Sequence, residues 1–253
     1  MLQGYYDERE KRKKDGLPSV PLSAQEVQEI ANAFENSSGN AELLNLIENE
    51  VSPGVDEAAY VKAAFLKDLA LEKTKTDLIT PQKSIEILGT MLGGYSVEAL
   101  VEILKKDKFA AEAAEALKNT ILVYDSFNEI FELSKNNSHA KSIIDSWANA
   151  EWFENKPTLD EEIKLTIYKV SGETNTDDFS PAKEAWSRPD IPLHAEAFLK
   201  FSENIDNPLD ELKKLKSDGS QLVFVGDVVG TGSSRKSAVN SMLWHMGSDI
   251  PFV

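Results

Sequence analysis

Apolar residues in the first half of the chain recur at the spacing of amphipathic helices. After Ser23, for example, Val27, Ile30 or Ala31, and Phe34 recur three or four positions apart and therefore share one helical face. The same spacing predicts further helices in the segments 43–47, 56–69, 80–92, 96–104, 108–119, 121–134 and 138–154. Helices joined by short turns are typical of stacked antiparallel pairs, in a helical solenoid or a compact bundle. Because no fixed-period motif is visible, the spacing itself predicts only an all-α domain over residues 1–157.

Polar residues and glycines mark several ends of these helices. Ser23 and Glu26 have the spacing of a capping box, which satisfies two backbone N–H groups at the start of a helix. Thr80 is expected to be an N-cap, because Pro81 follows it at the first helical position. The glycines at 93–94 are expected to end that helix before the next one begins.

Beyond residue 157 the hydrophobic period changes. Ile163, Leu165 and Ile167 alternate with polar neighbours, which is typical of a half-buried β-strand. Further expected elements are a polar loop at 172–178, helices at 191–202 and 208–217, a buried strand at 222–225 and a last helix that ends at Gly247. Strands mixed with helices predict an α/β domain over residues 158–253, truncated at its C-terminus.

The stretch GDVVGTGSSRKSAVNS at residues 226–241 is the strongest candidate for binding chemistry. We expect a glycine-rich turn over 226–232 after the buried strand, and a helix that begins near 233–235. Backbone N–H groups and the positive end of the helix dipole then face the same way, which favours an anion. Ser233, Ser234 and Arg235 add hydroxyls and a guanidinium suited to a carboxylate or phosphate. The alternative is a tight connection whose glycines only form the turn.

Two common nucleotide-binding loops do not match this stretch. A P-loop needs Gly-x4-Gly-Lys-Ser/Thr, and counting from Gly226 the second glycine would fall on Thr231. The dinucleotide fingerprint Gly-x-Gly-x-x-Gly finds Gly230 and Gly232 but meets Arg235 in place of the third glycine. A small polycarboxylate is therefore the better match for the Ser-Ser-Arg group.

Composition narrows the classes of protein and partner. The chain has 253 residues, a formal net charge of −16 and no cysteine. An acidic surface repels nucleic acids, and without cysteine there is no disulfide framework. No apolar run approaches the roughly 18 residues of a membrane span. The charged N-terminus lacks the apolar segment of a secretory signal. We expect a cytoplasmic protein with no membrane partner.

Distinctive blocks of sequence run from near one end of the chain to the other. Besides 226–241 they are SPGVDEAAYVKA at 52–63, LGTMLGGY at 88–95, SWANAEWF at 146–153, and VSGETNTDDFSPA with AWSRPDIPLHA within 170–195. Together they resemble the aconitate hydratase B family of bacterial enzymes. The resemblance implies a HEAT-like helical repeat domain over 1–157 and part of a swivel-type α/β domain over 158–253. Family enzymes are several times longer, so the chain is interpreted as an N-terminal portion of such an enzyme.

The resemblance also implies a reaction and residue roles. Family enzymes interconvert citrate and isocitrate through cis-aconitate in the tricarboxylic acid cycle, and also dehydrate 2-methylisocitrate. Ser233 matches the catalytic serine base, Arg188 and Arg235 match arginines that hold substrate carboxylates, and Ser234 belongs to the same substrate-binding group. A [4Fe–4S] cluster, held by cysteines of later domains, completes the family's site. A chain without cysteine cannot hold this iron-sulfur cluster, so we expect it to be inactive alone.

Arg188 and the acidic pair 177–178 also have simpler interpretations. Without the resemblance, Arg188 is best explained by a surface ion pair with Asp190 or Glu184. Asp177 and Asp178 could be paired acid/base groups or metal ligands, but adjacent aspartates on a loop are more often solvated turn formers. We assign no catalytic role to either aspartate.

The three histidines are too dispersed in the sequence to predict a metal site. His194 lies near Arg188 and is expected to line the same cleft. His139 and His245 are interpreted as ordinary helix residues. The aromatic residues Trp147, Trp152 and Phe153 are expected to be core residues at the end of the helical domain.

A basic cluster lies near the N-terminus, at Arg9 and at residues 11–14. Interleaved acidic residues favour its interpretation as the solvated face of a first helix. The resemblance also links the family with regulatory RNA, a partner for which the sequence itself carries little support.

Two hypotheses of different classes follow. In the first, the chain supplies a protein-interaction domain and substrate-binding residues to an aconitase, with the remaining domains and a homodimer through the helical domain as partners. In the second, it is a stand-alone regulatory module whose anion loop senses tricarboxylates. A reading frame that continues past Val253 into cysteine-bearing domains would favour the first.

Overall fold

The computed structural model describes residues 2–36, 39–91, 93–120, 123, 126–155, 158, 161–202, 205–217, 219 and 221–247. The chain forms two compact units, one from residues 1–11 and 19–158, the other from 12–18 and 159–253. Each unit has its own cluster of buried hydrophobic residues. The expected boundary between residues 157 and 158 stays a prediction, because Pro157 lies outside the described residues.

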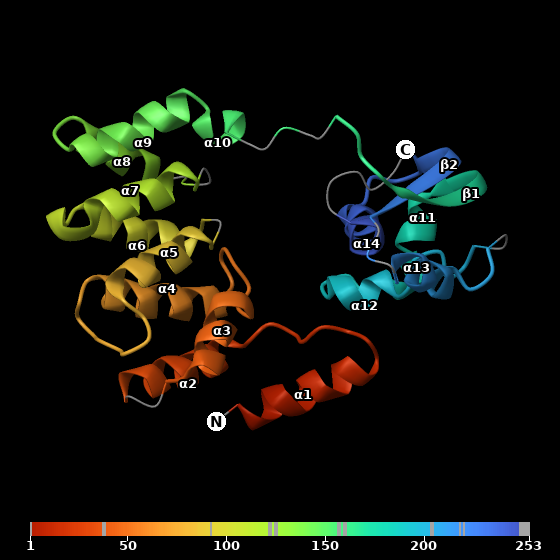
Figure 1. Cartoon of the computed structure of the whole chain (residues 1–253), viewed down its shortest axis with the longest axis horizontal. Coiled ribbons are helices and arrows are strands. Elements are labelled where there is room, and N and C mark those ends of the chain that lie inside the picture. Colours follow the sequence, from red (N-terminus) through yellow and green to blue (C-terminus); the bar gives the residue numbers. More distant parts are fainter. Residues whose placement is uncertain are drawn as a thin grey trace. The chain divides into compact units, whose positions relative to one another are not determined.

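In its described part, the first unit is built from helices (Figure 1). They are α1 (Gln3–Lys14), whose last residues belong to the second unit, α2 (Ala24–Glu35), α3 (Ala41–Asn49), α4 (Glu57–Ala70), α5 (Pro81–Gly89), α6 (Tyr95–Leu104), the short 3-10 helix η1 (Asp107–Phe109), α7 (Ala110–Lys118), α8 (Ser126–Ser134), α9 (Ser138–Ala148) and α10 (Glu151–Glu154). None of the helices described in either unit is both long and apolar enough to cross a lipid bilayer.

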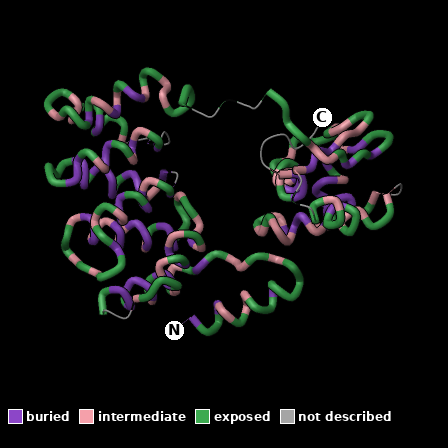
Figure 2. Tube along the Cα trace, viewed as in Figure 1, coloured by how far each residue is buried: buried purple, intermediate pink, exposed green. Residues whose placement is uncertain are grey.

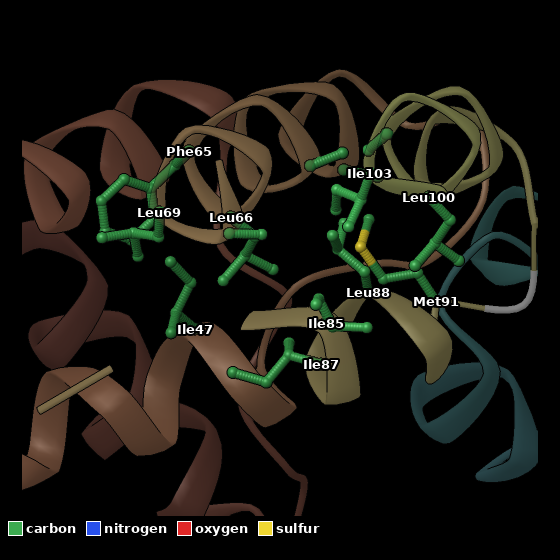
Figure 3. Packing of buried hydrophobic residues seen from close by; sticks show 14 of the residues in the cluster. Ile47, Phe65, Leu66, Leu69, Ile85, Ile87, Leu88, Met91, Leu100 and Ile103 are labelled. Atoms are coloured by element: carbon green, nitrogen blue, oxygen red, sulfur yellow. The ribbon is translucent and has the colours of Figure 1, made fainter. Parts of the chain in front are cut away.

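The helices of the first unit pack as two rows. Helices α2, α4, α6 and α8 follow one another in contact, as do α5, α7 and α9, and contacts such as α4–α5 and α6–α7 join the rows. Buried residues follow the sides where the rows meet (Figure 2). Figure 3 shows Leu66 of α4, Leu88 of α5 and Leu100 of α6 within this core, and all three are fully buried. The predicted all-α character of this region is confirmed.

Most helix ends follow the sequence signals. Ser23 accepts from the backbone N–H of Glu26, and the Glu26 carboxylate accepts from that of Ser23, so the capping box is formed. Thr80 caps α5 as expected. The expectation for glycines 93–94 is wrong, since α5 already ends at Gly89. Gly94 instead precedes α6 with φ +65°, where a Cβ would lie 2.2 Å from the carbonyl oxygen of Gly54.

The last helices of this unit are shorter than predicted. Ala150 adopts a left-handed conformation with φ +53°, which separates α9 from α10. Trp147 is half-buried against the core and donates to the carbonyl of Leu117. Trp152 and Phe153 are 37% and 58% exposed, so the expectation that they are core residues is wrong. The start of the segment 121–134 lies partly outside the described residues, and α8 covers its end.

The second unit contains a parallel pair of strands with helices between and after them (Figure 1). Its elements are β1 (Thr166–Asn175), α11 (Thr176–Phe179), the 3-10 helix η2 (Ala182–Ser187), α12 (Ile191–Ala195), α13 (Pro208–Lys216), β2 (Leu222–Thr231) and α14 (Lys236–Met246). Thr166 pairs with Leu222 and Tyr168 with Phe224, while the register shifts between Val170 and Glu173. Parallel strands need a crossover connection, which here spans α11 to α13.

Both strands extend further than the hydrophobic pattern predicts. β1 starts later than expected and continues through 172–175, which were expected to be loop, and α11 follows it directly. β2 continues from the apolar run 222–225 to Thr231. The two extensions pair with each other, for example Thr174 with Val229. Each extension is stabilised as a strand by the other, although its own sequence is too polar to predict a strand. Phe179, Phe198 and Phe224 pack ring against ring in the core below.

Candidate functional site

The turn that carries Ser233, Ser234 and Arg235 joins β2 to α14, but its shape differs from the expectation. Gly226 and Gly230 lie within β2, so the predicted glycine-rich turn is only the short segment 232–235. Gly232 has φ +92°, and a Cβ there would lie 3.2 Å from the Thr176 hydroxyl, so the turn requires glycine. The helix begins at Lys236 rather than near 233–235. Strand, turn and helix N-terminus nevertheless follow one another as predicted.

Ser233 and Ser234 are exposed on this turn. The carbonyl of Ser233 accepts from the Thr176 hydroxyl at 2.8 Å, which ties the turn to the start of α11. Arg235 is the N-cap residue of α14, and its side chain forms no capping hydrogen bond to the first turn of the helix. The N-terminus of this helix therefore has no side-chain cap from its N-cap residue, and the predicted anion site at this position stays a prediction.

A cavity of about 370 Å³ lies beside the turn. Thr176, Ser234 and Arg235 line its polar part, and its remaining wall is largely apolar, with Phe179 and Met242 among the lining residues. Its volume is within the range of small-molecule sites, roughly 300–1,000 Å³. Ser233 and Arg188 are not among the residues that line it.

The guanidinium of Arg235 is already bound to a carboxylate of this chain. Its Nη1 donates to Oδ1 of Asp177, and its Nη2 donates to Oδ2 at 3.2 Å. Nη1 also donates to the carbonyl of Ser180 at 3.1 Å. Two parallel contacts to one carboxylate are the geometry that a planar guanidinium offers to a bound carboxylate ligand.

Arg188 follows η2 and does not form the ion pair that the simpler interpretation expects. Asp190 is bound instead by Arg12, whose Nη1 and Nη2 lie 2.8 and 3.2 Å from its two carboxylate oxygens. Glu184 is bound by Lys200 at 2.7 Å. Nε of Arg188 is buried and has no hydrogen-bond partner among the described residues. A buried donor without a partner indicates a position that a ligand could satisfy.

Arg12 also corrects the interpretation of the basic cluster near the N-terminus. Arg12 is only 8% exposed, and its Nε donates to the carbonyl of Pro18 at 2.6 Å. Arg12 and Pro18 belong to the second unit together with Asp190. Arg12 is therefore a structural residue of that unit rather than part of a solvated face.

Both predicted arginines act on Asp177. Hydrogen bonding from Arg235 lowers the pKa of Asp177 below its ordinary value, and the charge of Arg188 lowers this pKa further. Arg235 therefore contacts this carboxylate directly, whereas Arg188 influences it only through its charge. Asp177 was expected to be only a solvated turn former, and its ion pair with Arg235 was missed.

Asp178 has a different role from its neighbour. Its carboxylate accepts from the backbone N–H of Asn175 at 2.8 Å and from the hydroxyl of Ser202 at 2.9 Å. The first contact completes a capping box at the start of α11. The pair 177–178 therefore does not act as two equivalent carboxylates.

His194 of α12 is buried close to Arg188 and is held between serines. Its Nδ1 lies 2.8 Å from the hydroxyl of Ser187, and its Nε2 lies 2.8 Å from that of Ser180. The Ser180 hydroxyl also lies 2.7 Å from that of Ser237. The sequence places His194 near Arg188 correctly, but carries no signal for the hydrogen bonds that link it to Ser187, Ser180 and, through Ser180, to Ser237. The three serines come from separate elements, which only the tertiary fold brings together.

The described residues contain no group of three or more histidine, cysteine, aspartate or glutamate side chains arranged to hold a metal ion. The chain also has no cysteine, so it offers no thiolate for an iron-sulfur cluster. The residues of this site therefore do not fit a cluster, and what they can offer chemically is binding of an anion and exchange of a proton.

Both units of the chain match models of known protein families. Residues 4–153 match the family described as the Aconitate B N-terminal domain, which is more than half of the chain. The chain belongs to the aconitate hydratase B family. Residues 165–253 match a second family description, the Aconitate hydratase 2 N-terminus, so the unit that carries the site is covered as well.

Individual aconitate hydratase B proteins are similar to this chain along its whole length. The identity is 50% to Aconitate hydratase B of Synechocystis sp., 48% to that of Escherichia coli and 49% to that of Helicobacter pylori. Each alignment covers 100% of this chain but only 29% to 30% of the relative. The chain thus spans less than a third of the length of the curated relatives that it matches, at their N-terminal end.

Proposed function

We propose that Arg188 and Arg235 bind carboxylates of a tricarboxylate substrate, in the aconitate hydratase reaction that interconverts citrate and isocitrate through cis-aconitate. The observation that carries the proposal is the carboxylate of Asp177. It is held in two-point contact by Arg235, and the charge of Arg188 lowers its pKa. Nε of Arg188 is buried and has no hydrogen-bond partner in the part of the chain that the structure describes. An internal carboxylate therefore occupies the place that a substrate carboxylate would take.

Ser233 is the proposed proton acceptor, and Ser234 is proposed to contact the same substrate. A serine hydroxyl is a weak base in water, so Ser233 needs nearby positive charge to stabilise an alkoxide-like oxygen. Arg235 and the first residue of α14, Lys236, lie two and three residues after it in the chain. In this role Oγ of Ser233 takes a proton from a substrate carbon, and the arginines keep that carbon oriented.

The [4Fe–4S] cluster that we propose for the complete enzyme is not held by this chain, which has no cysteine. The chain contributes substrate-binding groups and a proton acceptor, and 2-methylisocitrate is proposed as a second substrate. We expect residues 1–253 to show no aconitase activity by themselves.

For the first unit we propose a HEAT-like repeat that binds protein surfaces, including the remaining domains and a second copy of the enzyme. The support is the packing of α2, α4, α6 and α8 in one row and α5, α7 and α9 in another, since stacked helix pairs present extended surfaces. RNA as a partner rests on the family resemblance alone, because Arg12 of the basic cluster is bound to Asp190. We also propose that the protein is located in the cytoplasm.

Titration of the chain with citrate, followed by amide NMR, tests the site. Half of a site open to water should bind at about millimolar strength, near −4 kcal/mol. Shift changes should centre on residues 230–237 and on Arg188. The variants Arg188→Lys and Arg235→Lys keep the charge but lose the planar fork, so each should weaken binding by about tenfold or more.

Arg9→Lys is the matched control, because Arg9 belongs to the first unit whereas the proposed site residues belong to the second, and it should leave citrate binding unchanged. In a complete enzyme, Arg235→Lys should lower kcat/KM by about 10- to 150-fold, the loss of one charged hydrogen bond. Citrate-induced shifts confined to residues 1–157, or wild-type affinity in both variants, would show that the arginines do not bind substrate.

A further inference from the structure

The environment of His194 determines which of its ring nitrogens carries a proton. His194 is 1% exposed, and each ring nitrogen lies 2.8 Å from a hydroxyl. Nδ1 faces the hydroxyl of Ser187, and Nε2 faces the hydroxyl of Ser180. A hydroxyl has one proton to donate, and Ser187 donates it to the carbonyl of Glu184 at 2.8 Å. Ser187 must therefore accept from His194, so Nδ1 carries the proton.

The remaining contacts follow from this assignment. In a neutral ring with a proton on Nδ1, Nε2 is an acceptor, so the Ser180 hydroxyl donates to it. With its own proton committed, Ser180 accepts from the hydroxyl of Ser237, 2.7 Å away. The result is one directed chain of hydrogen bonds from Ser237 through Ser180, His194 and Ser187 to the carbonyl of Glu184.

The two ends of this chain lie beside the two arginines of the site. Ser187 is the residue before Arg188. Ser237 lies in the first turn of α14, two residues after Arg235, and the carbonyl of Ser180 accepts from Nη1 of Arg235 at 3.1 Å. The imidazole therefore joins the segment that carries Arg188 to the segment that positions Arg235.

We propose that His194 is a positioning residue, which as its neutral Nδ1–H tautomer holds the two arginine-bearing segments in register for one ligand. This inference rests on the proposed function of Arg188 and Arg235 as carboxylate-binding residues. His194 itself touches neither the ligand nor the reacting atoms. Its effect on binding passes through Ser187 to Arg188 and through Ser180 and Ser237 to Arg235.

The charges around His194 keep it neutral. Burial lowers the pKa of His194 below its ordinary value, the charge of Arg188 lowers it further, and Glu184 opposes both. Protonation would turn Nε2 into a donor, and Ser180 would have to accept from both His194 and Ser237 unless Ser237 reversed. A charged His194 would thus require the hydrogen bonds of Ser180 and Ser237 to rearrange.

Long-range ¹H–¹⁵N NMR of the histidine rings in residues 1–253 tests the tautomer directly. His245 is an internal reference of the opposite kind, because its Nε2 faces the carbonyl of Ala195 at 2.8 Å and must carry the proton. The chain has three histidines, and the third, His139, is exposed. We expect His194 as the Nδ1–H form and His245 as the Nε2–H form. An Nε2–H or tautomer-averaged His194 would overturn the proposal.

Variants of His194 then test the positioning role through citrate affinity. His194→Ala removes both contacts and should weaken citrate binding by about tenfold. His194→Asn keeps a donor toward Ser187, and His194→Gln keeps an acceptor toward Ser180, so each should restore part of the affinity. The matched control His139→Gln should bind citrate as the wild type does. Wild-type affinity in the Ala variant, or no recovery in either amide variant, would contradict the proposal.

The Nε–H resonances of the arginines separate the two proposals. Independently of citrate, His194→Ala should shift the resonances of Arg188 and Arg235 and leave those of Arg9 in place. If wild-type chain binds no citrate while these shifts occur, the proposed function is wrong and the positioning role stands. If citrate binds at 230–237 while the arginine resonances do not respond to any His194 variant, the positioning role is wrong and the proposed function stands.

Discussion

At the scale of single residues, Arg188 and Arg235 differ in whether the guanidinium is already bound to a carboxylate of the chain. Arg235 forms a two-point contact with Asp177, whereas the buried Nε of Arg188 has no partner among the residues that the structure describes. Asp190 and Glu184, the two acidic neighbours of Arg188 in sequence, are bound by Arg12 and Lys200. Because other cations engage these carboxylates, Arg188 stays available to a ligand.

Asp177 should compete with an incoming carboxylate for Arg235. Asp177→Asn removes the charge but keeps the size of the side chain, so the guanidinium is left free for a ligand. We expect the Asn variant to bind citrate more tightly than the wild type does, measured by calorimetric titration. Asp145→Asn is the control, because Asp145 is also an exposed, ion-paired aspartate, bound to Lys141 in the first unit. Weaker citrate binding in Asp177→Asn would show instead that Asp177 orients Arg235.

His245 should make the stability of the second unit depend on pH. Burial lowers the pKa of His245 from its ordinary value of 6.5 to about 4. Between these values the unfolded chain binds a proton that the folded chain does not, so stability should fall as the pH falls from 6.5 to 4. The full effect is at most about 3 kcal/mol in the free energy of unfolding.

The variant His245→Gln tests this dependence, because glutamine keeps a donor for the carbonyl of Ala195 but does not titrate. Denaturant unfolding at a series of pH values should give a flatter profile for this variant than for the wild type. His139→Gln, at an exposed position, should keep the wild-type profile. Identical slopes for His245→Gln and the wild type would mean that His245 does not contribute to the acid sensitivity.

At the scale of elements, the helix starts are set locally and the strand ends are not. Ser23 and Glu26 form their capping box with each other, within one turn of α2. The polar residues at the end of β1 are held as a strand only because the end of β2 lies beside them. A helix terminus needs partners three residues away, whereas a strand needs a partner from elsewhere in the chain.

Removal of the capping hydroxyl should therefore weaken the first unit measurably. Ser23→Ala loses the acceptor for the backbone N–H of Glu26 and should lower the free energy of unfolding by about 1 kcal/mol. Ser138→Ala is the matched control, because Ser138 is the exposed first residue of α9, where Asn137 supplies the cap. It should change stability by less than about 0.5 kcal/mol. Equal effects of the two variants in chemical denaturation would argue against the capping role.

At the scale of the whole molecule, the two hydrophobic clusters share no residue. Leu66 and Phe224 are both fully buried, one in each cluster. Leu66→Ala should cost about 2–5 kcal/mol and Phe224→Ala about 3–5 kcal/mol, through lost burial and a residual cavity. Hydrogen exchange should show lower protection of α4 and α5 in the first variant, and of β1 and β2 in the second.

Leu78→Ala, at a position that is 43% exposed, is the control for both variants and should leave the exchange pattern unchanged. If Leu66→Ala lowered protection in β1 and β2 as strongly as in α4, the two units would not be independent in stability.

Much of this architecture could be predicted from the sequence because its causes are local. Helical spacing predicted the all-α first region, and the caps at Ser23 and Thr80 were located correctly. The motif at 226–241 predicted the order of strand, turn and helix N-terminus around Arg235. Local signals failed where partners are distant in sequence, as in the extent of β1 and β2 and in the exposure of Phe153.

The sequence by itself determined the family, the helical first region and the residue types available to a carboxylate site, because these depend on identity and on spacing along the chain. The tertiary structure alone decided which charges meet. It paired Arg235 with Asp177 and Arg12 with Asp190, and it placed His194 between Ser187 and Ser180. Ion pairs and hydrogen bonds act over a few ångströms in space, so separation along the chain does not reveal them until it has folded.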